Sequence, residues 1–257
     1  MLTNENYFSQ EASRIYTGAT EIKKFMSCQE AALAEWNGEW AEDKKEVFMQ
    51  GNYFDSFFDG TREQFEELNR KIIFNAKGAY YAPFQKVFDA YERVKRDKMW
   101  MQFAAEGQQE LIMTGEIEGV PVKIKIDSYH DGKVIVDRKL MGDMKRKWID
   151  GQWKSFIGAY GYDLSGWVYQ EIVRQNTGKI IPVMLTVVTK EKTSQIEIIN
   201  INQSEMDSQE ENVRNVIRQI QMLKVGEVEP NKCGMCSYCL ETKVCSEILD
   251  SSALLMD

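Results

Sequence analysis

The first hundred residues show apolar positions at helical spacing. Residues 20–38 predict an amphipathic helix whose apolar positions are Ile22, Phe25, Met26, Leu33 and Trp36. A second helix is predicted over residues 44–58, and a third after Thr61, which stands at capping-box spacing from a glutamine. A fourth is predicted from Pro83, because proline is favoured in the first turn of a helix. Residues 1–105 are therefore expected to be mainly helical.

The period of the pattern changes in the middle of the chain. Residues 110–139 are rich in Val and Ile and are interrupted by Glu-Gly and Asp-Gly turn signals, so they predict three antiparallel strands. A long helix is predicted from about Gly151 to Gln175, with Trp153 among its apolar positions. The runs IIPVMLTVVT and QIEIININ predict two further strands, and a last amphipathic helix is predicted after Ser204.

This order of elements predicts one α/β domain over residues 1–257. A helical N-terminal part precedes a core over residues 106–202, and a C-terminal helix with a cysteine-rich tail follows over residues 203–257. No internal repeat, low-complexity tract or Pro/Ser-rich linker divides the sequence. Sequence patterning alone therefore favours a single folding unit.

Composition and charge narrow the functional classes. Hydrophobic residues make up 43% and charged residues 28%, which is typical of globular proteins, and the net charge of -8 argues against DNA coating through bulk electrostatics. A metal-dependent nuclease is still allowed, because it concentrates carboxylates at its centre. A Ser-His-Asp mechanism has little support with His130 as the single histidine. No apolar run approaches the roughly 18–20 residues needed to span a bilayer, and the N-terminus lacks the features of a signal peptide, so a cytoplasmic location without a membrane partner is expected.

The segment KVIVDRK carries the candidate chemistry. Asp137 and Lys139 share one face of a strand because side chains alternate, and Asp127 lies ten residues earlier on the predicted partner strand. Two carboxylates can hold Mg2+ or Mn2+, and a lysine beside the metal can orient water or stabilise the transition state of phosphodiester hydrolysis. An isolated DxK is usually a solvated strand face, but here an acidic partner and a following helix and strand favour a catalytic centre.

The order helix, three strands, helix, strand with D…DxK resembles the core of the PD-(D/E)XK nuclease superfamily, specifically its RecB-like and RecE-like exonucleases. TEIKKFMSCQEAALAEWNGE and GNYFDSFFDG resemble the N-terminal blocks of a phage-associated, RecE-like branch. GYDLSGWVYQEIVRQNTGK and CGMCSYCLETK resemble its later blocks. The resemblance implies a restriction-endonuclease-like core, with a mixed central sheet flanked by helices, and a metal-dependent DNA nuclease with Asp127, Asp137 and Lys139 as catalytic residues.

Residues around the centre depart from the superfamily pattern in two places. Where a histidine usually stands four residues after a helical glycine, Gly51 is followed by Asp55, which is expected as a third metal ligand or, alternatively, as a buried polar residue. Where glutamine usually stands three residues after the tyrosine of the long helix, Ser165 is found instead. The residues expected to bind DNA or support the centre are Gly51, Tyr162, Ser165, Tyr169 and Gln170.

Cysteines crowd near the C-terminus. Cys236, Cys239 and Cys245 form CxxCx5C, and with Cys28 they resemble the four-cysteine frame that holds a 4Fe-4S cluster in AddB-type and CRISPR-adaptation nucleases. Alternatively, Cys233 joins the three later cysteines in a local Zn2+ site, or all five are free thiols. A metal would be structural, because it would attach the tail to the body of the protein.

The resemblance implies a DNA exonuclease that resects duplex ends in phage or prophage recombination. A RecT-like single-strand annealing protein is the implied partner, and a homo-oligomeric ring around DNA is the implied assembly. Two alternatives stay open. One is a structure-dependent or single-strand nuclease of the same superfamily, and the other is a DNA-binding or scaffold relative without catalytic activity.

Overall fold

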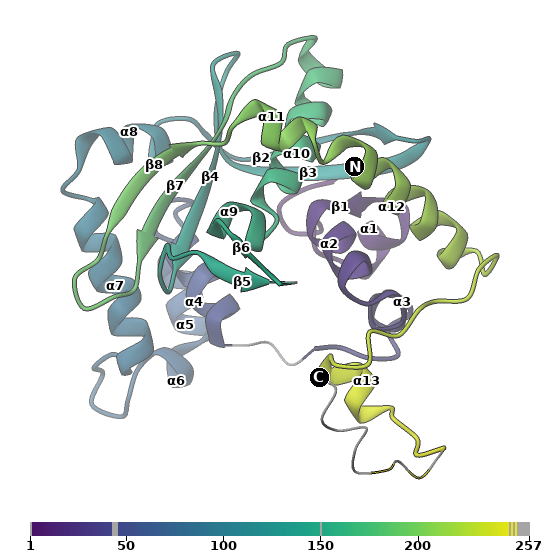
Figure 1. Ribbon diagram of the computed structural model, residues 1–257. Coiled ribbons are helices and arrows are strands. Elements are labelled where there is room, and N and C mark those ends of the chain that lie inside the picture. The colour runs from purple at the N-terminus through teal and green to yellow at the C-terminus, as the bar shows by residue number, and fades with distance from the viewer. Residues whose placement is uncertain (1, 43–45, 150, 247, 249, 251–257) are drawn as a thin grey trace.

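A mixed sheet forms the centre of the computed structural model, which describes residues 2–42, 46–149, 151–246, 248 and 250 (Figure 1). Six strands pair in the order β1-β3-β4-β7-β8, with β2 also on β3. Their bounds are Thr17–Gly18 (β1), Gln108–Ile117 (β2), Val120–His130 (β3), Val134–Met141 (β4), Val183–Thr189 (β7) and Ile196–Asn200 (β8). The predicted antiparallel order of β2, β3 and β4 is confirmed, while β4 and β7 are parallel.

The first predicted helix is two helices. α2 (Ala19–Ser27) and α3 (Gln29–Asn37) are separated by Cys28, whose backbone is extended at φ -160° and ψ 110°. The predicted end is confirmed, since Gly38 adopts φ 78° and its N–H bonds carbonyls of the last turn. A short α1 (Gln10–Ile15) precedes them. The sequence pattern missed the break because apolar spacing continues across it.

A group of helices follows before β2. It comprises α4 (Glu46–Asp55), α5 (Arg62–Leu68), α6 (Arg70–Ile73), α7 (Ala82–Val94) and α8 (Lys98–Ala105). The predicted start of α4 at residue 44 lies outside the described residues. Pro83 lies in the first turn of α7, as predicted, but Thr61 makes no capping bond to α5, because its hydroxyl donates to Asp59 Oδ1 at 2.6 Å.

The long helix predicted from Gly151 begins at Tyr162, eleven residues later. In its place, β5 (Lys147–Ile149) and β6 (Gln152–Lys154) form a separate antiparallel hairpin, followed by α9 (Phe156–Ala159) and α10 (Tyr162–Thr177). Gly151 at φ 73° suits the hairpin turn, and Gly161 at φ 61° separates the two helices. The last helices are α11 (Gln203–Asp207), α12 (Glu210–Lys224) and α13 (Ser237–Glu241).

Helices cover both faces of the sheet (Figure 1). On one face, α2, α10 and α12 pack in a cluster that includes Ile22, Trp167 and Ile217. On the other, α4, α7 and α8 pack in a cluster that includes Phe54, Phe84 and Trp100. Neighbouring residues of β7 enter opposite clusters, as strand alternation requires. The protein is therefore a mixed α/β fold with a central sheet between helical layers.

None of the described helices is both long enough and apolar enough to cross a bilayer.

Candidate active site

Asp127 and Asp137 lie opposite each other where β3 and β4 separate. In the antiparallel pairing of β3 with β4, His130 pairs with Val134 and Ser128 pairs with Val136. Asp127 and Asp137 are the next two residues in the same register. Asp127 Oδ2 accepts a bond of 2.7 Å from the backbone N–H of Arg138, one residue beyond Asp137. The separating strands thus leave room for two carboxylates between them.

Burial and the neighbouring Asp127 both disfavour the ionised form of Asp137. Asp137 is only 9% exposed, and burial raises the pKa of its carboxyl group to about 6. Lys139 opposes the rise, while Asp127 adds to it both by its charge and by a side-chain hydrogen bond. A cation between the two carboxylates would relieve this repulsion, so the donor set fits a hard divalent ion.

Lys139 lies directly against the Asp137 carboxylate. Its Nζ donates to Asp137 Oδ1 at 2.7 Å, as expected for alternate residues on one strand face. Burial lowers the pKa of Lys139, but the charges of Asp137 and Asp127 outweigh burial and raise it above its usual value. The Tyr162 ring centroid is 5.5 Å from the same Nζ. The ammonium group therefore stays charged beside the carboxylates.

Arg138, between Asp137 and Lys139, points to the other face of β4. Its side chain is completely buried, and its Nη1 donates to Ala104 O at 2.9 Å and to Asp127 O at 3.1 Å. A third bond from Nη1 reaches Gln109 Oε1 at 2.5 Å. The guanidinium thus ties β4 to β3, β2 and the end of α8. Sequence reasoning missed this role, although a charged residue within a buried strand is a signal for a paired ion.

Asp55, at the end of α4, contacts Arg138. Its Oδ1 lies 3.4 Å from Arg138 Nε, and burial raises its pKa to about 7, with Asp127 adding to the rise. Asp55 does not complete a compact carboxylate group. Among the described residues, three or more ligand atoms all within 4.8 Å of one another occur at cysteines only. Asp55 is half-buried and paired with Arg138, and its role as a metal ligand stays a prediction.

Glu110 is a further acidic residue that the sequence pattern did not reveal. It stands opposite Asp127, between the pairs Gln109 with Ser128 and Leu111 with Ile126. Its side chain forms an ion pair with Lys125, and its Oε1 is 3.7 Å from Arg138 Nη2. Its φ of 55° is unusual for a residue other than glycine and marks local strain, which proteins often hold at functional sites.

The supporting residues predicted on α10 separate into two groups. Tyr162 contacts Lys139. Burial raises the pKa of Tyr169 well above its usual value, and the nearby charges of Asp137 and Asp127 add to the rise. Ser165 donates to Gly161 O at 3.1 Å within its own helix. Gln170 points away from the centre, because its Nε2 donates to Ile181 O at 2.8 Å and to Gln203 Oε1 at 3.0 Å. These bonds join α10 to α11 and to the segment before β7, and a supporting role for Gln170 stays a prediction.

Gly51 has no steric reason to be glycine. A Cβ built there would meet nothing within 4 Å. The residue lies on α4, one turn before Asp55. A DNA contact that needs close backbone approach stays a prediction for this position.

Four cysteines form a second candidate site, away from the carboxylates. The Sγ atoms of Cys28, Cys233, Cys236 and Cys239 all lie within 4.8 Å of one another. Cys28 Sγ is 3.6 Å from Cys239 Sγ, and Cys233 Sγ is 3.9 Å from it. Neither predicted four-cysteine set matches this group.

Cys245, a member of both predicted sets, is exposed and lies outside the group. The physical reason is the fold of the tail. α13 begins directly after Cys236 and keeps Cys239 one turn from Cys236, while the chain leaves that helix before Cys245. Backbone N–H groups of Met235 and Cys236 lower the pKa of Cys233 to about 6, whereas burial raises that of Cys236 to about 12.

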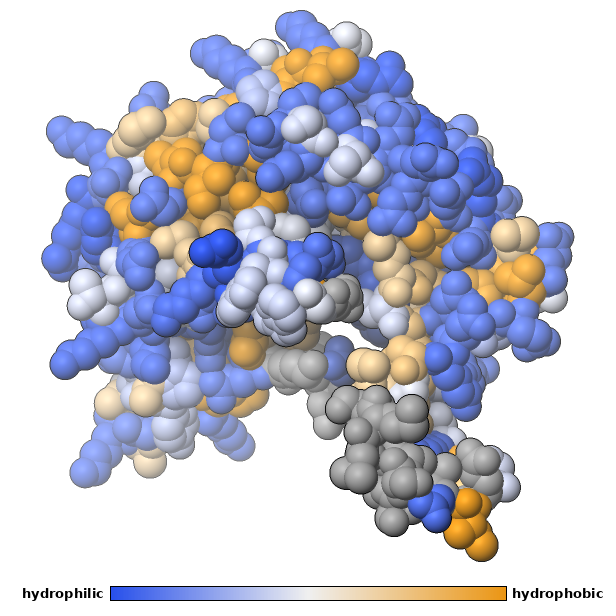
Figure 2. Space-filling model, in the orientation of Figure 1, coloured by the Kyte–Doolittle hydropathy of each residue, from blue (hydrophilic) through white to orange (hydrophobic). Residues whose placement is uncertain are grey.

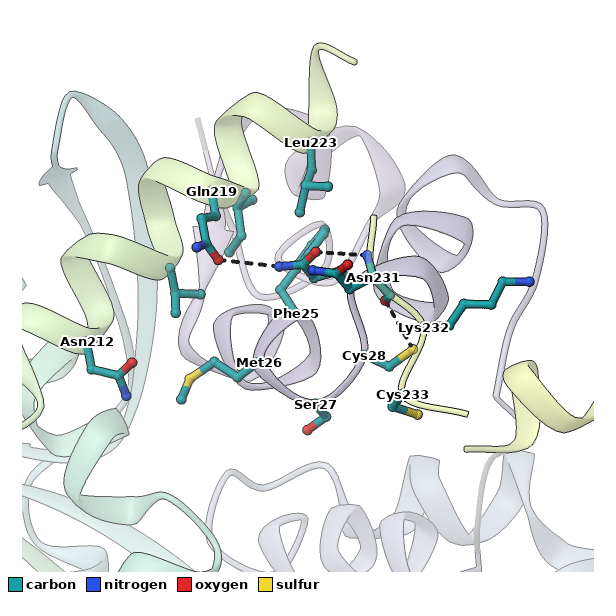
Figure 3. A pocket seen from close by; sticks show the side chains of 13 residues that line it. Phe25, Met26, Ser27, Cys28, Asn212, Gln219, Leu223, Asn231, Lys232 and Cys233 are labelled. Carbon is teal, nitrogen blue, oxygen red and sulfur yellow. Dashed lines mark hydrogen bonds between the residues drawn. The ribbon is translucent and has the colours of Figure 1, made fainter. Parts of the chain in front are cut away.

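The tail is held against the α2–α3 junction by its backbone as well. Asn231 O accepts from Glu30 N at 3.2 Å, and Asn231 N donates to Gln29 Oε1 at 3.0 Å. A pocket of about 370 Å³ opens between this segment, α2 and α12, with Cys28 and Cys233 on its wall (Figure 3). The extended backbone at Cys28 thus places its thiol toward the tail.

Comparison with known proteins decides the family. The family described as "PDDEXK-like domain of unknown function (DUF3799)" matches residues 18–242. The chain belongs to this family. Its carboxylates and lysine on β3 and β4 therefore stand in a PDDEXK-like domain, which confirms the superfamily expected from D…DxK.

Solved structures agree with this membership. A crystal structure of a "putative exonuclease" from Eubacterium rectale is 36% identical, covers 100% of this chain and 98% of its own, and has a TM-score of 0.94. A structure of a protein called SSO0001 is 11% identical over 90% of this chain and 96% of its own, with a TM-score of 0.35, which supports no argument. No curated protein matches the sequence significantly.

Proposed function

We propose that the protein is a divalent-metal-dependent DNA nuclease whose catalytic residues are Asp127, Asp137 and Lys139. The observation that carries the proposal is the placement of two carboxylates on adjacent strands, with the Lys139 ammonium 2.7 Å from Asp137. Membership of a PDDEXK-like family supports the same function. A solvated strand face does not explain the arrangement, because Asp137 is buried.

Each residue has a role that its contacts allow. Asp127 and Asp137 would hold Mg2+ or Mn2+, which prefers oxygen ligands, and the ion would supply an activated water and charge neutralisation. Lys139 is held as a charged ammonium and can stabilise negative charge that builds on the phosphate. Arg138 is a positioning residue, because it bonds the Asp127 carbonyl and faces Asp55 from a fully buried position.

An exonuclease acting on duplex ends is the specificity that we propose. The name of the Eubacterium rectale protein, which is similar over the whole chain, supports an exonuclease. Resection for phage or prophage recombination, a RecT-like annealing partner and a ring-shaped assembly stay predictions that follow from the resemblance.

A cleavage assay with matched DNA topologies tests the proposed function. Purified full-length protein is incubated with end-labelled linear, nicked circular and covalently closed circular DNA of one sequence. Linear DNA should be degraded with Mg2+ or Mn2+, and Ca2+ should suppress cleavage because its longer bonds position water poorly. Cleavage of the closed circle at the same rate would contradict exonuclease action, and undiminished cleavage without divalent metal would contradict the metal centre.

We also propose that the four grouped cysteines hold one Zn2+ ion. A tetrahedral ion with metal–sulfur bonds of about 2.3 Å separates its sulfurs by about 3.8 Å. The distances of 3.6 Å and 3.9 Å to Cys239 Sγ match this value. In a 4Fe-4S cluster each thiolate binds a different iron, so the thiolates surround a much larger body. The thiol spacing therefore favours a single ion, whose role would be to fasten the tail to the α2–α3 junction.

A further inference from the structure

The β5–β6 hairpin carries two tryptophans that the protein leaves uncovered. Trp148 and Trp153 are a cross-strand pair with ring centroids 5.5 Å apart, and they are 60% and 63% exposed. Burial of large apolar side chains stabilises a folded protein, so two adjacent exposed tryptophans lack that contribution. Exposed clusters of this kind mark interaction surfaces.

Basic residues surround the tryptophan pair. Residues 143–154 contain four basic residues, Lys145, Arg146, Lys147 and Lys154, and two acidic residues, so their net charge is +2 in a chain of net charge -8. Lys145 and Arg146 are exposed, while Lys147 pairs with Asp143 at 2.9 Å. The local charge is thus opposite in sign to that of the whole protein. A local positive field suits a negatively charged ligand.

The hairpin adjoins the candidate active site through aromatic side chains. α9 packs against β5 and β6, and Lys147 at the hairpin base interacts with Tyr160. The Tyr160 ring centroid is 5.8 Å from that of Tyr162, and Tyr162 contacts Lys139. Figure 1 shows the hairpin in the centre of the molecule, between α4 and α2, and Figure 2 shows its mixed pale and blue surface standing forward on that face.

We infer that the β5–β6 hairpin binds unpaired nucleotides of the DNA strand that enters the active site. Bases would stack on Trp148 and Trp153, and phosphates would contact Lys145 and Arg146, because tryptophan faces with nearby cations are the usual combination for single-stranded nucleic acid. The assignment rests on the proposed nuclease function. It deepens that function by naming the element that binds the strand, the hairpin between β4 and α9, and by naming its ligand, unpaired DNA.

Equilibrium binding to the full-length protein tests the assignment. Fluorescence anisotropy is measured for a labelled 12-nucleotide oligo-dT and for a blunt 12-base-pair duplex, with Ca2+ as the divalent ion. Trp148→Ala with Trp153→Ala should raise the Kd for oligo-dT at least tenfold, equivalent to about 1.4 kcal/mol. Trp148→Phe with Trp153→Phe should recover most of the affinity, because phenylalanine still stacks. The effect on the blunt duplex should be smaller.

Charge and control variants complete the design. Lys145→Ala with Arg146→Ala should reduce the salt dependence of log K by about 1.4, the value for two phosphate contacts on a single strand. Tyr81→Ala and Lys192→Ala remove an exposed aromatic and an exposed cation elsewhere and should leave the Kd unchanged.

Three results would overturn the inference. The first is an unchanged Kd for oligo-dT in the double alanine variant, and the second is no recovery of affinity in the double phenylalanine variant. The third is a changed molar mass of the double alanine variant in light scattering together with unchanged oligo-dT binding, which would assign the tryptophans to contacts between copies of the chain. Binding is read without turnover, whereas the proposed function is read from cleavage by the wild-type protein. A failure of one is therefore distinguishable from a failure of the other.

Discussion

Replacing Asp137 with asparagine should stabilise the metal-free protein at neutral pH. Burial holds the pKa of Asp137 at about 6 against an ordinary value of 3.8, so its ionised form is disfavoured in the folded state. Two pKa units correspond to about 3 kcal/mol, at 1.36 kcal/mol per unit. The pKa of about 6 already includes the charge and the hydrogen bond of Lys139, so we expect the free energy of unfolding at pH 7.5 to rise by about 1–3 kcal/mol.

The raised pKa of Asp137 also predicts how the stability of the protein changes with pH. A carboxyl whose folded pKa lies above its unfolded pKa binds more protons in the folded state, so stability falls as pH rises from about 4 to about 6. Asp55, with a pKa of about 7, extends the fall in the same direction. The asparagine variant lacks the contribution of Asp137 and should lose less stability over this range. Saturating Mg2+ should stabilise the wild-type protein more than the variant, because it binds the ionised carboxylate.

Urea unfolding at pH 4.5 and 7.5 measures both effects. The buffers should lack Mg2+ and contain no chelator, so that a metal held by the cysteines is not removed. Asp143→Asn is the matched control, because Lys147 lowers the pKa of Asp143 and the sign of its effect is opposite. If Asp137→Asn were less stable than the wild type at pH 7.5 without metal, the claim that burial disfavours an ionised Asp137 would be refuted.

The remaining predictions concern the residues around the two candidate sites. Arg138→Met should lower the free energy of unfolding by about 3–5 kcal/mol in urea, because it leaves the carboxylates of Asp55 and Glu110 and two backbone carbonyls without their partner, and a neutral result would contradict that role. Metal analysis should find one zinc per chain in the wild type and in Cys245→Ser but little in Cys28→Ser or Cys233→Ser, whereas equal iron and sulfide would indicate a cluster. Lys139→Met should still bind Mn2+ by electron paramagnetic resonance but lose DNA cleavage, and retained cleavage would remove lysine from the chemistry.

The strands and the acidic centre could be predicted because their signals are local. β-branched residues with Glu-Gly and Asp-Gly turns fix a hairpin, and strand alternation then fixes which faces Asp137 and Lys139 occupy. The register of that hairpin brings Asp127 opposite Asp137 without information from elsewhere in the chain. The pairing of β4 with β7 joins distant segments, and the order of elements suggested it only through the family resemblance.

Features that depend on tertiary contacts were missed. Arg138 and Glu110 meet only because β2, β4 and α8 pack together. The break at Cys28 and the exchange of Cys245 for Cys233 depend on where the tail docks. At Trp153, apolar periodicity suggested a helix, although Gly151 between two short alternating segments was a turn signal.

Cleavage by Asp127→Asn tests the central claim most directly. The substitution keeps the size of the side chain and removes one of the two carboxylates proposed to hold the ion, and Asp131→Asn in the adjacent turn is its control. With end-labelled linear duplex DNA and Mg2+, the account predicts that Asp127→Asn loses cleavage to the background level while Asp131→Asn cleaves at the wild-type rate. Cleavage by a folded Asp127→Asn protein at the wild-type rate would contradict the assignment of the catalytic centre.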